Sequence, residues 1–418
     1  MKDMKYSGAR WLGNIPADWN TNKLKYHLRR NEPKNPGNMV VLSLYRELGI
    51  IPKDSRNDNH NVTSEDTSKY KYVQIGDFVV NKMKAWQGSV AVSDYEGIVS
   101  PAYYVYNFTD DAFVKRYFHY LIRGCYKNEF MRLSGGIRVG QWDLPSSALD
   151  NVIVLIPPKE TQIDIANFLD AKCAEIDALI ADIQAQIDTL EQYKRSVITE
   201  TVTKGLNPNA EMKDSGIQWV GEIPAHWSVH PVYSYYGERK KKNRLGKEDN
   251  LLSLSYGRVI RKDINTNDGL LPESFNTYNI VEAGDIIIRP TDLQNDKRSL
   301  RTGLVKEHGI ITSAYIDLCP LKQVDSRYFH FLLHAYDVMK VFYNMGNGVR
   351  QGLNYSEFSR LMVFEPPYDE QVAMADYLEN KVTEVDAIIE QKKEQMSVLD
   401  AYKRSLIFEY VTGKKEVV

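Results

Sequence analysis

The sequence predicts an α+β fold, with two similar globular domains joined by long antiparallel paired helices and related by pseudo-two-fold symmetry. Three observations lead to this expectation. Motifs in the first half of the chain recur about 208–209 residues later, a distance far beyond the period of a solenoid repeat. Each copy mixes short β-like runs with helical patches. Each copy then ends in a long helical pattern without an internal proline.

The composition is that of a globular protein. The chain has 418 residues, of which 43% are hydrophobic and 26% charged, and this length suggests two to four domains. Its apolar runs are shorter than the ~18 residues that span a bilayer, and the N-terminus lacks the apolar core of a signal peptide. Three scattered cysteines, Cys125, Cys173 and Cys319, favour a reducing compartment. We therefore expect a cytoplasmic protein without a disulfide framework or a metal site.

The net charge of −2 hides an uneven distribution. Residues 20–156 and 228–364 each carry an excess of about four positive charges, whereas residues 159–204 and 366–412 are acidic. Ordinary fluctuation produces excesses of this size. Because the basic excess recurs in both copies, the pattern favours a polyanionic partner for the two basic stretches.

Each copy opens with a short segment rich in tryptophan, glycine and proline. The pattern Ser-Gly, Trp, Gly, Ile-Pro, Trp occupies residues 7–19 and returns at residues 215–227. Glycine and proline at these spacings indicate a fixed loop, not a helix.

The body of each copy follows, with anchors at matched places. Predicted strands pair up as Val40–Leu44 with Leu251–Leu254, Phe78–Val80 with Ile286–Ile288, and Val152–Ile156 with Leu361–Phe364. A helical patch, Arg116–Leu121, returns as Arg327–Leu332. Between these anchors the copies differ, most clearly at residues 82–96 and 289–308. A shared scaffold with divergent loops suits two related domains that recognise different targets.

A long helix closes each copy. Pro157 and Pro158 end the preceding strand, and the next glycine is Gly205. Seam positions then alternate at spacings of four and three. They are Leu169, Cys173, Ile176, Ile180, Ile183, Ile187 and Leu190 in copy one, and Leu378, Val382, Val385, Ile389, Lys392, Met396 and Leu399 in copy two. Such a seam could pack on the globular body, but its length favours helix-on-helix packing. Roughly 45 residues make a rod of about 67 Å, with Lys194, Lys392 and Lys403 as polar residues that set its register.

At this point the residues resemble a known family, the specificity subunits of type I restriction–modification enzymes. The resemblance covers nearly the whole chain and rests on the order and duplication of its motifs. These are the opening Trp/Pro segments, Ile137-Arg138-Val139-Gly140-Gln141-Trp142, Gly348-Val349-Arg350-Gln351-Gly352-Leu353, Pro157-Pro158 with Gln162 and Phe168-Leu169, and the Tyr-Lys-Arg-Ser pairs at residues 193–196 and 402–405.

The resemblance implies a non-catalytic subunit without a cofactor, in which two target-recognition domains each bind one half of a bipartite site in double-stranded DNA. It also implies helical regions that hold the domains apart and dock two methyltransferase (modification) subunits, with restriction/motor subunits in the full complex. The corresponding boundaries are residues 1–156 and 206–365 for the target-recognition domains, and 157–205 and 366–418 for the helical spacers. The copies diverge before the double proline, so the two domains should not recognise the same bases.

Candidate DNA contacts follow matched strands or lie in glycine-containing segments. The first group is Lys82, Lys84, Trp86 and Gln87 in copy one and Arg289, Thr291, Gln294, Asn295, Lys297 and Arg298 in copy two. The second group is Arg138 and Gln141, with Arg350, Gln351 and Asn354. Arginine and lysine pair with guanine or phosphate, and amides pair with adenine. Any one of these residues is as well explained as part of a solvated loop. The basic run 239–244 suits a phosphate clamp or, almost equally, a solvated loop.

Two patterns with other chemistry are rejected. Glu365-Pro366-Pro367-Tyr368 resembles an amino-methyltransferase motif, but its copy-one counterpart begins with Ile156 and lacks an amide or carboxylate. His330 and His334 have the spacing of a zinc pair on a helix, yet no glutamate lies between them. The main alternative to DNA recognition is a tandem protein-interaction scaffold whose basic loops bind acidic proteins. A third possibility, a cryptic methyltransferase, predicts cofactor binding by the isolated chain.

Overall fold

The computed structural model describes residues 3–46, 48–56, 63–64, 66–136, 142–265, 272, 274–291, 293, 300–341, 343, 345 and 352–417. The chain divides into two units. The first contains residues 1–183 and 394–418, and the second contains residues 184–393. Among the described residues, no helix is both long enough and apolar enough to cross a membrane.

The first unit is built on a four-stranded antiparallel sheet in the order β4-β11-β8-β9. These strands are β4 (Leu28–Arg30), β11 (Tyr103–Phe108), β8 (Phe78–Asn81) and β9 (Val90–Val92). Four antiparallel pairs surround it: β1 (Met4–Tyr6) with β2 (Asn14–Pro16), β3 (Asn20–Lys23) with β12 (Ile153–Ile156), β5 (Leu42–Tyr45) with β6 (Gly49–Pro52), and β7 (Lys71–Val73) with β10 (Gly97–Val99). The short helices are η1 (Leu24–Tyr26), η2 (Lys53–Ser55), η3 (Ala85–Gln87), α1 (Lys115–Cys125), α2 (Lys127–Leu133) and α3 (Ser146–Asp150).

The centre of the sheet is buried on both faces because the first three positions of β8, Phe78–Val80, are all apolar and buried. Phe78 and Val80 point to a core shared with α1, whereas Val79 points to a second cluster beneath the β5–β6 hairpin. Successive side chains of a strand point to opposite faces, so this continuous apolar run fits a central strand covered on both sides.

The second unit repeats this topology with different loops. Its sheet has the order β16-β23-β20-β21, formed by β16 (Tyr236–Glu238), β23 (Ile316–Pro320), β20 (Ile286–Ile288) and β21 (Thr302–Leu304). The surrounding pairs are β13 (Met212–Asp214) with β14 (Glu222–Pro224), β15 (Ser228–Pro231) with β24 (Met362–Glu365), β17 (Leu252–Ser255) with β18 (Arg258–Arg261), and β19 (Asn279–Val281) with β22 (Gly309–Ile311). Its short helices are η4 (Val232–Ser234), α5 (Ser326–Val338) and α6 (Tyr355–Phe358). The sequence repeat is therefore a repeat of fold, and the predicted α+β class is confirmed.

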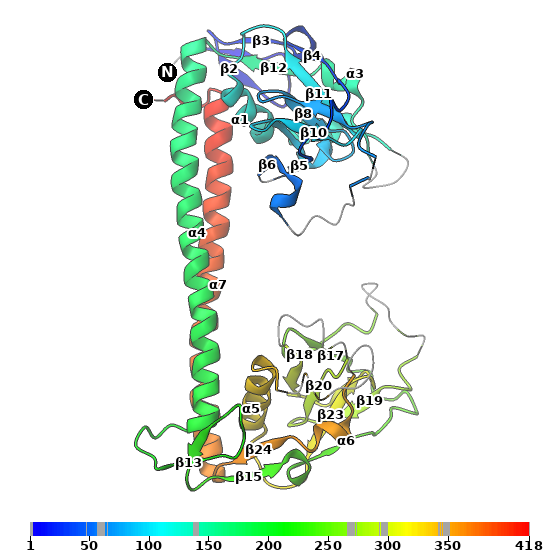
Figure 1. Cartoon of the computed structure of the whole chain (residues 1–418), viewed down its shortest axis with the longest axis vertical. Helices are drawn as coiled ribbons and strands as arrows, with labels where there is room; N and C mark the ends of the chain where they lie inside the picture. Colours follow the sequence, from blue (N-terminus) through cyan, green and yellow to red (C-terminus); the bar gives the residue numbers. More distant parts are fainter. Residues whose placement is uncertain are drawn as a thin grey trace. The chain divides into compact units, whose positions relative to one another are not determined.

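Two long helices join the units: α4 (Lys159–Lys204) and α7 (Tyr368–Val411). Within each unit they lie side by side (Figure 1) and run antiparallel. In the first unit the rings of Phe168 and Tyr410 are 4.4 Å apart at their centroids, and Asp177 bonds Lys403. In the second unit Gln186 bonds Lys392, and Lys194 bonds Asp386. Since partner numbers fall along α7 as they rise along α4, the predicted antiparallel pairing is present in each unit.

The predicted seam residues lie between these helices or under the globular bodies. Leu169, Ile176, Ile187, Leu378, Val385 and Ile389 are buried, and Ile180, Ile183, Leu190, Met396 and Leu399 are half-buried. Leu169 and Ile176 belong to the main core of the first unit, and Leu378 belongs to that of the second. In each unit the two long helices therefore pack on the globular body as well as on each other. Helices α1 and α5 lie between the helix pair and the sheet of their own unit (Figure 1).

The opening Trp/Pro segments pack against helix ends. Gly413, which follows α7, has φ +70°, and a Cβ there would lie 2.9 Å from the Trp19 ring. Gly205, which follows α4, has φ +75° and the same relation to Trp227, at 3.2 Å. Glycine is required because both the positive φ and the close ring exclude a side chain. The predicted fixed loop thus contains a short strand, β2 or β14, and covers the end of a long helix in its own unit.

Candidate nucleic-acid interface

In the first unit the loop after β8 is closed by its own backbone. The amides of Lys84 and Gln87 donate to the carbonyls of Asn81 and Lys84 at 3.0 and 2.9 Å. This forms the single turn η3, which packs on α2. Gly88 ends the turn with φ +92°. The loop is short and locally hydrogen-bonded, so it holds its side chains in a defined orientation.

A second segment, residues 142–144, lies against this loop. The Leu144 amide donates to the Lys82 carbonyl at 2.9 Å, and the Lys82 ammonium is 3.2 Å from Asp143 Oδ2. The rings of Trp86 and Trp142 are 5.4 Å apart. The residues that directly follow the predicted contact Gln141 therefore lie beside the loop after β8.

The predicted contact residues of the first unit differ in exposure and in their role in the fold. Lys84 is exposed and has no carboxylate partner among the described residues. Gln87 is half-buried, and Trp86 is half-buried with its indole N–H donating to the Met83 carbonyl at 3.1 Å. Trp86 thus supports the loop from within. Arg138 and Gln141 lie outside the described residues.

The second unit has the same arrangement at the loop after β20. The Leu353 amide donates to the Pro290 carbonyl at 2.9 Å, which matches the bond from Leu144 to Lys82. Arg289 and Thr291 on either side of Pro290 are exposed, and Arg289 has no carboxylate partner among the described residues. Gln294, Asn295, Lys297, Arg298, Arg350 and Gln351 lie outside the described residues.

Asn354 caps the N-terminus of α6. Its side-chain oxygen accepts from the Glu357 backbone N–H at 3.0 Å, and its own backbone N–H donates to Glu357 Oε2 at 3.2 Å. This capping box begins α6. The predicted role of Asn354 in binding a base would compete with that cap.

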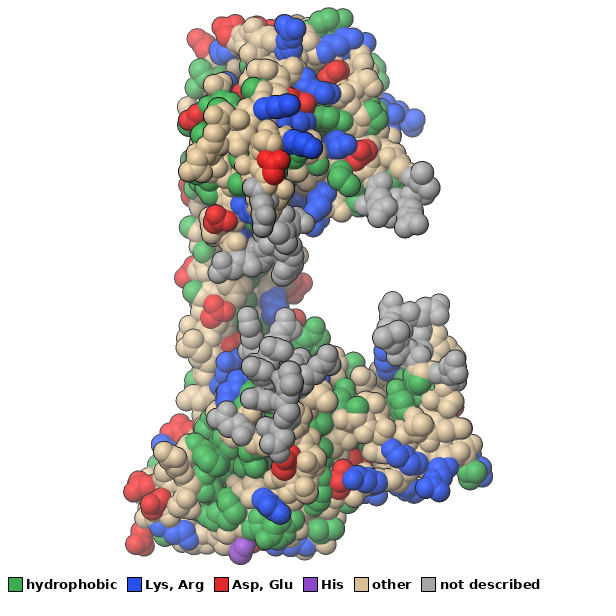
Figure 2. All heavy atoms as spheres, turned by 45° about the vertical axis from the view of Figure 1, so that its right-hand side comes forward, with side chains coloured by type: hydrophobic (Ala, Val, Ile, Leu, Met, Phe, Trp, Pro, Cys, Tyr) green, Lys and Arg blue, Asp and Glu red, His purple; other side chains and the backbone are tan. Residues whose placement is uncertain are grey.

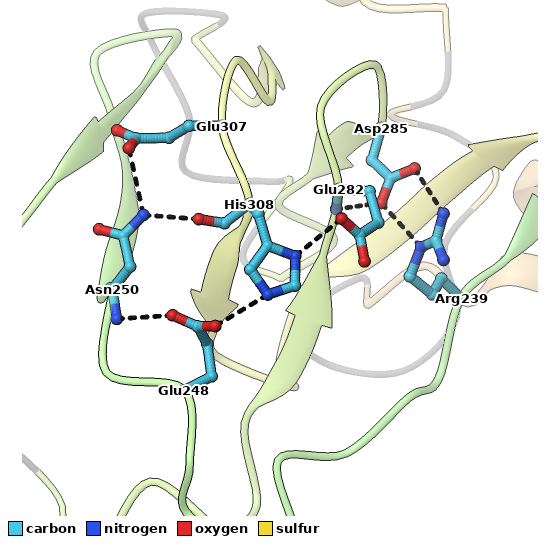
Figure 3. Close-up of polar contacts among 7 residues, drawn as sticks. All are labelled: Arg239, Glu248, Asn250, Glu282, Asp285, Glu307 and His308. Atoms are coloured by element: carbon cyan, nitrogen blue, oxygen red, sulfur yellow. Dashed lines mark hydrogen bonds and ion pairs between the residues drawn. The ribbon is translucent and has the colours of Figure 1, made fainter.

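The basic run at residues 239–244 is largely satisfied within the second unit. The Arg239 guanidinium binds Asp285 through two bonds of 2.8 and 3.1 Å, as Figure 3 shows, and Lys240 pairs with Glu238 at 2.8 Å. Lys242 donates to the Thr277 carbonyl. These bonds favour a structural role for Arg239, Lys240 and Lys242 over a phosphate clamp.

Buried carboxyls lie next to or within the central strands of both sheets. Asp77 and Asp285 occupy matched Gly-Asp turns and accept from the amides of Gln74 and Glu282, each at 2.8 Å. Burial raises the pKa of both carboxyls. In the second unit a further carboxyl, Asp317, is 1% exposed, and its oxygens have no hydrogen-bond partner among the described residues. Burial, followed by the charge of Asp285, raises the pKa of Asp317 to about 8.

In the second unit, His308 links the segments next to three strands, β17, β19 and β22 (Figure 3). His308 Nδ1 lies 2.7 Å from Glu282 Oε2, and its Nε2 lies 2.8 Å from Glu248 Oε2. Glu248 Oε1 also accepts from the Asn250 backbone N–H at 3.0 Å. Hydrogen bonding to Glu282 is the main cause that raises the pKa of His308. Both ring nitrogens are occupied by carboxylates, so the imidazole braces the small β17–β19–β22 region.

The rejected chemical patterns have structural explanations. The Glu365 carboxylate accepts from Tyr235 Oη and Lys322 Nζ, each at 2.9 Å, and so anchors β24 to its own unit. His330 is half-buried on α5, and desolvation lowers its pKa to about 3. Desolvation likewise lowers the pKa of His334, to about 4. These side chains serve the fold of the second unit.

Lys and Arg side chains lie close together on part of the first unit and along part of the second in the view of Figure 2.

A family model for the type I restriction modification DNA specificity domain matches residues 23–189. This span runs from β3 through the interface loops of the first unit into α4. Residues 23–189 belong to this specificity-domain family.

Similar proteins span the whole chain. The type I restriction enzyme MjaVIII specificity subunit of Methanocaldococcus jannaschii is 22% identical over 96% of this chain and 94% of its own length. The putative type I restriction enzyme MjaX specificity subunit of the same archaeon is 24% identical over 97% of this chain and 96% of its own length. The family predicted from the motifs is thereby confirmed.

Solved structures support the fold. A chain from a structure of the assembly and conformational transition of the type I R-M system has a TM-score of 0.69 at 12% identity, covering 96% of this chain and 99% of that one. The HsdS subunit from Thermoanaerobacter tengcongensis has a TM-score of 0.50 at 12% identity, covering 96% and 98%.

Proposed function

We propose that this specificity subunit recognises DNA sequence through the two loop pairs described above, one in each unit, and that each unit binds one half of a bipartite site. The observation that carries the proposal is the matched hydrogen bond from Leu144 to Lys82 and from Leu353 to Pro290. In each unit it joins two segments whose sequences diverge between the copies. Divergent loops on one repeated scaffold are what two half-sites of different sequence require.

Within this proposal the exposed basic residues bind DNA most directly. Lys84 suits a phosphate because its charge is compact and mobile, whereas Arg289 suits a guanine edge because its guanidinium forms two parallel bonds. Thr291 and Gln87 add polar contacts to bases or backbone. Trp86 keeps the first loop in shape.

The long helices have two further tasks in the proposal. They dock two methyltransferase subunits, and they set the distance between the half-sites. The length of α4, 46 residues, corresponds to about 69 Å of helix. Ion pairs across the helix pair in each unit favour one fixed register. Restriction/motor subunits would join the same complex, and the chain itself would act without catalytic activity.

The salt dependence of DNA binding tests the proposal against a protein-interaction scaffold. The complex with its modification subunits is titrated with duplex DNA between 50 and 200 mM salt, the range over which phosphate contacts weaken steeply. We expect affinity to fall steeply with salt and to depend on this chain. Lys84→Ala should reduce the salt slope by about one, the value for one lost phosphate contact. DNA binding that is the same with and without this chain would reject the proposal.

A further inference from the structure

Arg301 is a buried arginine at the C-terminal end of the connection between β20 and β21 in the second unit. It directly precedes β21, and its backbone carbonyl accepts from the Arg289 amide at 2.8 Å. Only 4% of the residue is exposed. Because a guanidinium stays charged in the interior, it must be surrounded by acceptors to be tolerated there. The sequence gives no hint of this, since Arg301 lies in a polar stretch with several other basic residues.

The acceptors of Arg301 are main-chain carbonyls of the proposed DNA-binding segment. Its Nη1 donates to the carbonyl oxygens of Arg289 at 3.3 Å and Thr291 at 2.5 Å. The guanidinium therefore holds the backbone on both sides of Pro290, while the side chains of Arg289 and Thr291 remain exposed.

Two further side chains hold Arg301 in place from α5 and the segment after it. The Arg301 amide donates to Asp337 Oδ2 at 2.8 Å, and the carboxylate of Asp337 is completely buried. The Tyr343 hydroxyl accepts from Arg301 Nε at 3.3 Å and donates to Asp337 Oδ1 at 3.1 Å. These connected hydrogen bonds orient the guanidinium toward the backbone of Arg289 and Thr291.

In the first unit the corresponding loop is held without a buried charge. Ser89 occupies the matched position, because its carbonyl accepts from the Asn81 amide at 3.1 Å directly before β9. There the shorter loop is closed by backbone bonds such as that from Ser89 to Lys84. In the second unit the sequence between β20 and β21 is longer, and the Arg301 side chain bonds the backbone near its start. Arg301 thus marks a difference between the loops, and not a feature of the common scaffold.

We propose that Arg301, held by Asp337 and Tyr343, is a positioning residue that sets base selectivity at the half-site bound by the second unit without contacting a base. This inference rests on the proposed DNA-recognition function. It predicts that disturbing the network alters selectivity at one half-site and leaves the other unchanged. A purely structural role would instead lower the amount of folded complex and affect methylation at both half-sites alike.

Two variants test the inference in the assembled methyltransferase. Arg301→Lys keeps the charge but cannot bond two carbonyls and Tyr343 together. Tyr343→Phe removes only the hydroxyl and carries the test if the first variant does not assemble. Methylation is measured on duplexes with every single-base change in either half-site, together with the melting temperature of each complex. Ser89→Ala serves as the matched control in the first unit.

We expect both variants to lose about tenfold in discrimination at one half-site, with selectivity at the other unchanged, and Ser89→Ala to behave as the wild type. Wild-type selectivity in both variants would overturn the inference. Equal relaxation at both half-sites, or losses that follow the amount of folded complex, would overturn it as well. If the unaltered complex methylates no bipartite site, the proposed function itself fails, which is a separate outcome.

Discussion

The Lys403 ammonium lies 2.6 Å from both carboxylate oxygens of Asp177, although the two residues are 226 positions apart. In the second unit Lys194 bonds Asp386 at 2.7 Å. The lysines occupy matched positions of the repeat, and so do the aspartates. Each unit therefore joins its two long helices with the same ion pair. A polar pair inside an apolar seam favours one register over its alternatives.

Removing this pair should have a small and non-additive effect on stability. Lys403 is 26% exposed and Asp177 is 59% exposed, so solvent weakens their attraction. A double-mutant cycle with Lys403→Met and Asp177→Asn should give a coupling of roughly 0.3–1 kcal/mol in urea unfolding. The exposed pair Lys393–Glu390, on one helix, is the control and should give less. Strictly additive effects of the two substitutions would contradict the proposed link between helices.

Alanine at Gly413 should destabilise the chain more than alanine at Gly205. Both have positive φ, which costs an L-residue about 1 kcal/mol. At Gly413 a Cβ would also lie 2.5 Å from Pro16 Cδ, whereas at Gly205 its nearest neighbour is 3.2 Å away. Gly13, with φ +68° and no neighbour within 4 Å, is the matched control for the backbone cost alone. Thermal unfolding should rank Gly413→Ala, Gly205→Ala and Gly13→Ala in this order of damage. Equal losses would show that the Trp/Pro segment does not press on the helix end.

The stability of the second unit should fall as the pH rises from about 4 to 8. The Asp317 carboxyl has a pKa of about 8 when folded and one near 4 when unfolded. Between these values the folded chain holds one more proton, so each pH unit costs at most about 1.4 kcal/mol. His308, whose folded pKa is also raised, loses its contribution in the same direction as the pH rises. The effect of Asp317 must therefore be isolated by substitution.

Asp317→Asn removes the titration, and Asp317→Val introduces the residue type of the matched position, Val105. Both should have flatter melting profiles than the wild type between pH 5 and pH 8.5. The gain should be greatest at the alkaline end, where the wild type carries a buried charge. Profiles that run parallel for all three chains would show that Asp317 is not protonated in the fold.

Substitutions in the interface loops should act on one half-site each. Arg289→Ala should weaken or relax recognition of the half-site bound by the second unit by about 1–3 kcal/mol, the range for a base contact. Gln87→Ala should act similarly on the other half-site. Each variant is the control of the other, and methylation selectivity of the assembled enzyme is the readout. A residue whose removal leaves selectivity unchanged does not contact bases.

The local elements were predictable because their signals are local. The strand Ile286–Ile288 has the predicted bounds, since three isoleucines follow a Gly-Asp turn. The predicted strand Val40–Leu44 is displaced to Leu42–Tyr45, because hairpin register depends on the partner strand β6. The long helices follow from their uninterrupted apolar spacing.

The connections within the interface could not be predicted in the same way. The contact between Lys82 and Leu144 and the network of Arg301 with Asp337 and Tyr343 join segments far apart in sequence. Nothing in the local pattern distinguishes buried Arg301 from exposed Arg289, since both are polar residues in a divergent loop. Only the three-dimensional fold separates the residue that supports the loop from the residue that the loop presents.

Lengthening the helix pair should lengthen the gap between half-sites. Matched insertions of seven residues, two helical turns, in the middle of α4 and of α7 preserve the apolar seam. They add about 10 Å, which corresponds to about three base pairs of duplex DNA. The recognised bases should stay the same. A methylated motif with an unaltered gap would reject the role of the helices in spacing, while leaving the interface loops untested by this change.

The methylated motif itself tests the central claim most directly. The chain is expressed with its modification subunits in a host without other methylation, and the methylome is sequenced. The account predicts one bipartite motif with two different half-sites and a fixed gap. Methylation that requires this chain but follows a single contiguous motif, or no motif at all, would contradict it.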